Sequence, residues 1–361
     1  MPRIDRERIG VAFDMQGCPN RCRHCWLGIG NSSTLSEADV RWGVSQFREF
    51  IGSTNTTIRH LAVATWFREP DFSDDYRHLY DLEEELGDGK PNRYELLSVW
   101  RLARDTTYAD WAKAIGPDTC QISFAGMKDT TDWFHRRTGA FDDALAASDR
   151  LLNVGMKPRW QLFLTTKLLP EIDDFLDLVA ERRLVDRVRE IGDEFRLFMH
   201  PPGPDDEGRK IEAFRPTADQ VADLPESILR ASRTHFQKRT LWQTEAALHA
   251  AILKGVVHRG DQGIMPDVLW FLVCSNWDVF ANIGTLEPWW RLGNLREDSV
   301  ETTIRRFEQD DVLGLQARLH KGAVDLANTY GDADGQKIYS DAGDLVSLYR
   351  AKHCEHEWSR R

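Results

Sequence analysis

The chain has no hydrophobic run long enough to cross a membrane and no surplus of positive charge. Of its 361 residues 41% are hydrophobic, yet no stretch approaches the roughly 20 consecutive apolar residues that a membrane-spanning helix needs. The formal net charge of −11 argues against the broad basic face that binds nucleic acid. The first ten residues, MPRIDRERIG, carry no signal peptide. We therefore expect a cytoplasmic protein that binds neither membranes nor nucleic acid.

Cysteine is also scarce, and half of it lies in one loop. Three of the six cysteines, Cys18, Cys22 and Cys25, form a C-x3-C-x2-C triplet directly after the apolar residues 9–15. This is not the even, spread pattern of a secreted disulfide protein, and it indicates a reducing compartment. Three thiolates at this spacing can hold three irons of a [4Fe-4S] cluster and leave the fourth iron open. The alternative is a structural zinc loop, which would need a fourth ligand, and His24 lies inside the loop rather than at a usual zinc spacing.

Strand-like and helix-like segments alternate along the first part of the chain. Such alternation is typical of βα units in a parallel barrel or sheet, so we predict an α/β fold. A loop rich in proline and acidic residues, 201–208, ends this pattern, and we place a soft domain boundary there, with residues 1–215 before it and 216–361 after it. The second part is expected to hold a helical stretch, 217–255, a strand-rich hairpin, 268–282, and further helices. The expected strands of the first part are residues 9–15, 57–65, 119–124, 157–165 and 194–200, and its expected helices are residues 35–51, 94–114, 140–154 and 171–183.

The cysteine loop, with the strand before it, resembles that of the radical S-adenosylmethionine (radical SAM) superfamily. The resemblance implies a partial (β/α)6 barrel over residues 1–215, related to the TIM barrel, with one [4Fe-4S] cluster on Cys18, Cys22 and Cys25. It also implies that the open iron binds the amino and carboxylate groups of SAM. An electron from an external donor, such as a flavodoxin, a ferredoxin or a dedicated reductase, would then cleave SAM to a 5′-deoxyadenosyl radical.

A second motif lies at residues 60–72, after the second expected strand. Radical SAM enzymes carry a Gly-Gly-Glu-Pro-like motif here, whose backbone and Glu bind the SAM amino group. Glu69 and Pro70 match it, whereas Phe67 and Arg68 replace the two glycines. A carboxylate suits this task because it accepts charge-assisted hydrogen bonds from an ammonium group. The alternative is a surface Glu in a turn that contains proline.

Further matches follow between residues 121 and 166. By resemblance, Ser123 would contact the SAM ribose, and an arginine, Arg136 or Arg137, would pair with the SAM carboxylate. Strand alternation puts Gln121 and Ser123 on one face, so that Cys120 lies on the other face as a buried core thiol.

Residues 271–284 and 289–299 resemble the C-terminal extension called SPASM, or its shorter twitch form. Asn282 stands where the extension has a cluster-ligating cysteine, so we predict an α+β extension that has lost its auxiliary cluster. The alternative recruits Cys274 and Cys354, with His353 or His356, to a degenerate site. Cys274 is also the candidate hydrogen donor to a substrate radical, with simple packing in a strand as the alternative.

The substrate is inferred from charge and from tryptophan. An acidic chain with 13 Trp residues, several of them next to acids, fits a site that stacks on sugar rings and binds amino groups. We expect a small cationic natural product, an amino sugar or aminoglycoside of antibiotic biosynthesis, and a lyase-type dehydration or an epimerisation. His200 and Glu207 are the candidate acid and base. The alternatives are a SPASM-type dehydrogenase, a peptide-modifying radical SAM enzyme, a glycyl-radical activase and an iron–sulfur scaffold without activity.

Overall fold

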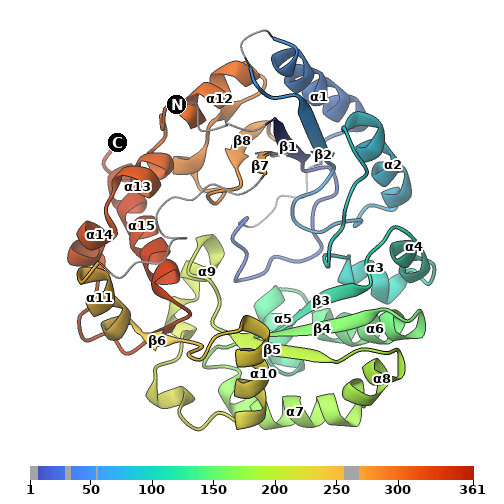
Figure 1. The fold of residues 1–361 in the computed structure, drawn as a ribbon, viewed down its shortest axis with the longest axis vertical. Helices are drawn as coiled ribbons and strands as arrows, with labels where there is room; N and C mark the ends of the chain where they lie inside the picture. The colour runs from blue at the N-terminus through green and yellow to red at the C-terminus, as the bar shows by residue number, and fades with distance from the viewer. Residues whose placement is uncertain (1–6, 29–33, 54–55, 256–267) are drawn as a thin grey trace.

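Two sheets with parallel strands lie on opposite sides of the ring of elements that Figure 1 shows. The structure is a computed structural model that describes residues 7–28, 34–53, 56–255 and 268–361. In the first sheet, ordered β2-β1-β7-β8-β9, strand β1 (Arg8–Phe13) runs parallel to β2 (His60–Ala64) and to β7 (Leu269–Val273), and β8 (Asp278–Ala281) and β9 (Gly293–Asn294) follow as antiparallel neighbours.

The second sheet consists of three parallel strands, β3 (Thr119–Phe124), β4 (Lys157–Phe163) and β5 (Arg196–His200). A small antiparallel pair joins β6 (Gln243–Thr244) to β10 (Ile338–Tyr339). No strand pairing joins the two larger sheets in the ranges that the structure describes. The α/β class is therefore confirmed. The strands of the described ranges do not form a closed barrel, and the partial (β/α)6 barrel stays a prediction.

Helices surround both sheets (Figure 1). They are α1 (Glu37–Ile51), α2 (Tyr76–Leu86), α3 (Val99–Arg104), α4 (Tyr108–Ala114), α5 (Lys128–His135), α6 (Ala140–Asn153), α7 (Ile172–Glu181), α8 (Leu184–Glu190), α9 (Asp206–Lys210), α10 (Glu226–Phe236), α11 (Glu245–Leu253), α12 (Val300–Glu308), α13 (Leu313–His320), α14 (Ala323–Tyr330) and α15 (Ala342–Trp358). No helix in the described ranges has the length and apolar content required to cross a membrane.

Local sequence signals explain most of these elements. The five strands expected in the first part are present, as are helices α1, α6 and α7. Ser36 and Asp39 form a complete capping box at the start of α1. Gly155, with φ +71, follows the end of α6, where a left-handed residue costs glycine little. Cys120 is fully buried on the outer face of β3, as predicted.

The single helix expected over 94–114 is wrong, because the chain forms two short helices there. Helix α3 ends at Arg104, and the next residue, Asp105, is extended. The Asp105 carboxylate accepts hydrogen bonds from the Thr107 backbone N–H and hydroxyl, both at 2.8 Å. Side chains that bond to nearby backbone in this way compete with helix formation.

Each large sheet has its own hydrophobic core. The first core packs α1, α12 and α13 against β1, β2, β7 and β8, and the second packs α6, α7 and α10 against β3, β4 and β5. At one close approach a Cβ on Gly10 of β1 would meet the Trp270 ring on β7 at 2.3 Å, so only glycine fits there.

Strands from both sides of the predicted domain boundary meet in the first sheet. Ile9 and Phe13 of β1 pair with Leu269 and Val273 of β7. The predicted division at residue 215 stays a prediction, and strands from after that residue complete the sheet that carries the cysteine loop.

Candidate active site

The cysteine loop leaves the end of β1 and is held against the C-terminal end of α5. The Arg21 and Arg23 backbone N–H groups donate to the carbonyls of His135 and Phe134 at 3.1 and 2.8 Å. The His24 ring stacks on Phe134 with a centroid distance of 4.6 Å. Thus α5, which the sequence patterns did not predict, is the platform on which the loop lies.

The three loop thiols are partly buried and lie near one another. Burial raises the pKa of Cys18, Cys22 and Cys25, and the charges of Cys18 and Cys25 raise the pKa of Cys22 further. The raised pKa values keep these groups protonated until a cation stabilises the thiolates, and irons would supply that positive charge, so the donor set fits a cluster. No group of three or more His, Cys, Asp or Glu side chains in the described ranges forms a ready site for a metal ion.

His135 connects Cys22 to strand β3. Its Nε2 lies 3.1 Å from the Ser123 carbonyl and its Nδ1 lies 3.1 Å from the Cys22 sulfur. A carbonyl can only accept, so Nε2 carries the proton and Nδ1 faces the sulfur. Burial lowers the pKa of His135 to about 4, which keeps the ring neutral. No local sequence pattern marks a role for His135, because Cys22 and Ser123 are distant from it in the chain.

Glu69 lies close to the cysteine loop, and its charge raises the pKa of Cys18 and Cys22. The Ser98 hydroxyl donates to Glu69 Oε1 at 2.8 Å. Burial raises the pKa of Glu69 to about 7. A carboxylate in this position favours a cationic neighbour. Pro70 follows it in the chain and is buried.

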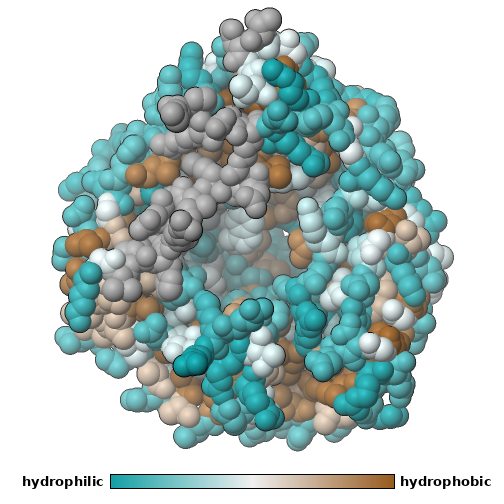
Figure 2. All heavy atoms as spheres, viewed as in Figure 1, coloured by the Kyte–Doolittle hydropathy of each residue, from teal (hydrophilic) through white to brown (hydrophobic). Residues whose placement is uncertain are grey.

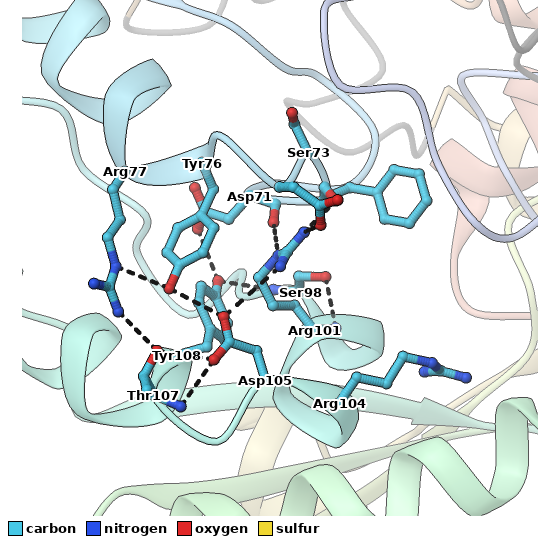
Figure 3. A network of polar contacts seen from close by, with 12 residues as sticks. Asp71, Ser73, Tyr76, Arg77, Ser98, Arg101, Arg104, Asp105, Thr107 and Tyr108 are labelled. Carbon is cyan, nitrogen blue, oxygen red and sulfur yellow. Dashed lines mark hydrogen bonds and ion pairs between the residues drawn. The ribbon is translucent and has the colours of Figure 1, made fainter.

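Polar contacts hold the loop that follows Glu69, and Figure 3 shows those that Arg101 and Tyr108 make to Asp71. Arg93, whose side chain is 1% exposed, pairs with Asp71 at 2.9 Å and with Glu83 at 2.6 Å. The Tyr108 hydroxyl donates to the second Asp71 oxygen at 2.7 Å. Glu83 belongs to the acidic run 81–88, whose composition predicts a solvated helix end or loop. Instead, this residue is buried as the partner of Arg93.

The predicted SAM-binding side chains of the second sheet already have partners. Ser123 donates to the Gln161 amide oxygen at 3.2 Å. Arg136 pairs with Glu207 at 3.0 Å. Arg137 pairs with Asp143 at 2.6 Å and donates to the Asn20 side chain at 2.6 Å. Either arginine would have to exchange a partner to bind a SAM carboxylate, so their predicted roles stay predictions.

His200 ends β5 and is held by hydrogen bonds. Its Nε2 accepts from the Gln161 side chain at 2.6 Å and its Nδ1 donates to the Pro201 carbonyl at 2.7 Å. Burial lowers the pKa of His200 to about 4. It does not line the cavity described next.

A cavity of about 480 Å³ lies between the cysteine loop, α9 and the β7–β8 turn, and brings two of the predicted catalytic residues together. Cys274 and Glu207 both line it, and so do Asp206 and the buried pair of Asp14 and Arg68. Burial raises the pKa of Cys274 to about 12, so it is a thiol rather than a thiolate at neutral pH. A thiol is the form that can give a hydrogen atom.

Cys354 lines a different cavity, of about 470 Å³, with Trp289, Trp290 and Asn282. The side chain of Trp26 is 46% exposed and borders both this cavity and a third cavity, which lies against strands β1, β2 and β7. Figure 2 shows a hollow near the middle of the molecule. Asn282 Oδ1 accepts from the Trp270 backbone N–H at 3.1 Å, which holds the hairpin at the position where a cysteine was expected.

The chain is similar in fold to solved structures, although its sequence matches neither a family model nor a curated protein. The solved structure of native anSMEcpe with bound AdoMet is 12% identical, covers 98% of both chains and gives a TM-score of 0.52. Native anSMEcpe with bound AdoMet and the Kp18Cys peptide gives the same values. These structure neighbours are radical SAM enzymes, and at this identity they show the fold alone.

Proposed function

We propose that this protein is a radical SAM enzyme, which binds a [4Fe-4S] cluster through Cys18, Cys22 and Cys25 and cleaves SAM reductively to a 5′-deoxyadenosyl radical. The observation that carries the proposal is the position of the three thiols. They follow β1, a strand that pairs in parallel with β2 and β7, in a fold similar to AdoMet-bound radical SAM structures. When bound, the cluster would supply the electron for SAM cleavage, and the electron donor would be a separate protein.

The chain's own residues would then orient SAM and the substrate. Glu69 would accept the SAM ammonium, with Ser98 holding its carboxylate in place. Ser123, Arg136 and Arg137 are the further candidates for the ribose and carboxylate. Cys274 would give a hydrogen atom to a substrate radical in the 480 Å³ cavity, where Glu207 also lies. Its S–H bond would break as the C–H bond forms, and one electron from the external donor and one proton from solvent would return the sulfur to a thiol.

Anaerobic reconstitution tests the cluster directly. The wild-type protein is expected to take up about four irons and four sulfides per chain and to cleave SAM. Replacing Cys18, Cys22 or Cys25 by Ala should abolish both, whereas the control C120A should retain both, because Cys120 is a core thiol. Zinc in place of iron, or iron uptake by the C18A variant equal to that of the wild type, would contradict the proposal.

For the substrate we propose a small polar amine such as an amino sugar, with dehydration slightly favoured over epimerisation. Mass spectrometry of the product from a substrate deuterated at the attacked carbon separates these reactions. Loss of water supports dehydration, and unchanged composition with solvent hydrogen at the carbon supports epimerisation through Cys274. Loss of two hydrogens contradicts both and would require an electron acceptor such as a second cluster.

A peptide is the second candidate substrate, because a structure neighbour holds a peptide with AdoMet. Parallel SAM cleavage assays with an amino sugar, a cysteine-containing peptide and a glycyl-radical protein distinguish the substrate classes. The substrate that accelerates SAM cleavage and is itself altered in mass identifies the class.

A further inference from the structure

Asp206 is the carboxylate of the 480 Å³ cavity that forms no ion pair in the described residues, although the more distant charges of Lys210 and Arg209 act on it and partly offset the effect of burial on its pKa. Asp206 is only 6% exposed, yet it lines the cavity. In the described parts of the chain it has no hydrogen-bond or ion-pair partner. The other carboxylates that line this cavity each have a cationic partner: Asp14 with Arg68, Glu207 with Arg136 and Lys210, Asp278 with Arg291, and Glu287 with Arg209.

A buried carboxylate without a partner is unfavourable unless a ligand supplies one. Burial, and secondarily the charge of Glu287, raises the pKa of Asp206 to about 7. A cation bound in the cavity would relieve both effects. The binding of a divalent metal ion requires several oxygen ligands, and the neighbouring carboxylates are already paired with arginine and lysine. An organic ammonium needs only one such acceptor.

The position of Asp206 connects this charge to the proposed reaction centre. A Cβ on Gly28, at the end of the cysteine loop, would lie 3.0 Å from Asp206 Oδ2. Gly28 has φ +69, a conformation that glycine adopts without strain. The absence of a side chain leaves Asp206 beside the loop that carries the proposed cluster. Cys274 lines the same cavity.

We infer that Asp206 binds the ammonium group of the substrate, and that the cavity between the cysteine loop, α9 and the β7–β8 turn is the site for a small amine. The inference deepens the proposed function and rests on it, since the amine would be the molecule that the radical attacks. Held at Asp206, it would lie between the cysteine loop and the thiol of Cys274.

Isothermal titration of the reconstituted full-length protein at about pH 8 tests the inference, because Asp206 is then ionised and an alkyl ammonium remains charged. The probes are trans-4-aminocyclohexanol and trans-1,4-cyclohexanediol, which differ only in the amine. We expect at least about tenfold tighter binding of the amine, the range of a hydrogen bond to a charged group. The Asp206→Asn variant should lose this preference. The control Asp173→Asn, which removes an exposed carboxylate on α7, should keep it.

Equal affinities of the wild-type protein for the two probes would overturn the inference, and so would an Asp206→Asn protein that keeps the preference. The wild-type comparison does not depend on the folding of any variant. SAM cleavage without substrate, measured in the same samples, separates the two proposals. Cleavage without amine preference leaves the proposed function standing, whereas amine preference without cleavage contradicts the proposed function and supports the cation site.

Discussion

At the scale of single residues, the protonation of Glu69 should control SAM binding. Burial raises the folded-state pKa of Glu69 to about 7. Since only the carboxylate binds an ammonium well, SAM affinity of the reconstituted protein should rise as the pH increases through about 7. Glu69→Gln should weaken SAM binding at pH 8 by about tenfold or more, and should remove this pH dependence. Isothermal titration with SAM between about pH 6 and 8.5 measures both effects.

The raised pKa of Glu69 also affects the stability of the SAM-free protein, which should fall, rather than rise, as the pH increases. A carboxyl group whose pKa is raised on folding stabilises the folded state only while it is protonated. The contribution of Glu69 to the free energy of unfolding therefore decreases as the pH rises from its ordinary pKa of 4.5 to about 7. A pH-independent SAM affinity in the wild type would contradict the role given to Glu69.

Ser98 is expected to act through Glu69. Its hydroxyl donates to Glu69 and accepts from the Arg101 backbone N–H at 3.1 Å, which caps α3. Ser98→Ala should lower stability by about 1 kcal/mol, as the loss of an N-cap does, and should also weaken SAM binding several-fold. Ser299→Ala removes the cap of α12 and is the matched control. In urea denaturation, Ser299→Ala should reduce stability by a similar amount, and it should leave SAM affinity unchanged. Equal SAM affinities of the two variants would contradict the positioning role of Ser98.

At the scale of elements, Arg93 joins the loop after β2 to helix α2. Arg93→Met would leave Asp71 and Glu83 buried without their cation, and such a change costs about 3–5 kcal/mol. Denaturant unfolding followed by circular dichroism should show a large fall in the midpoint. The control Arg41→Met also removes two ion pairs, with Glu37 and Glu85, but both lie at the surface, so the midpoint should change little because water screens them. Equal shifts of the unfolding midpoint for both variants would contradict a larger contribution of the buried Arg93 network to stability.

The sequence predicted elements well where local patterns decide them, and missed what depends on distant partners. In β3 the alternation of Cys120, Ile122 and Phe124 with polar residues was enough to fix its bounds. Glu83 reads as part of an acidic surface because nothing nearby shows that Arg93 will cover it.

The candidate site follows the same division. Cys18, Cys22, Cys25 and Glu69 belong to short motifs, so the sequence alone was enough to propose them as cluster and SAM ligands, and these roles stay proposals. His135 and Asp206 could not be proposed from the sequence alone. The role of His135 comes from Cys22 and Ser123, which lie far from it in the chain, and that of Asp206 from the lack of a partner in a cavity built by separate segments.

At the scale of the whole molecule, the C-terminal part should be required for the N-terminal part to fold. A fragment of residues 1–215 lacks β7, so β1 would lose one of its two neighbours and much of the first core. We expect the fragment to show poor dispersion in proton NMR and no cooperative thermal transition, unlike the full chain. A dispersed spectrum with cooperative unfolding would instead support the domain boundary predicted at residue 215.

The pairing of β1 with β7 also bears on biosynthesis. Ile9 must wait for Leu269, about 260 residues later, to leave the ribosome, which takes tens of seconds at about 5–20 residues per second. During that interval one edge of β1 has no partner strand, and the adjacent cysteines are not yet enclosed by the hairpin. If these cysteines bind the proposed cluster, the order of translation leaves Cys18, Cys22 and Cys25 accessible to cluster-assembly proteins before β7 and β8 are synthesised.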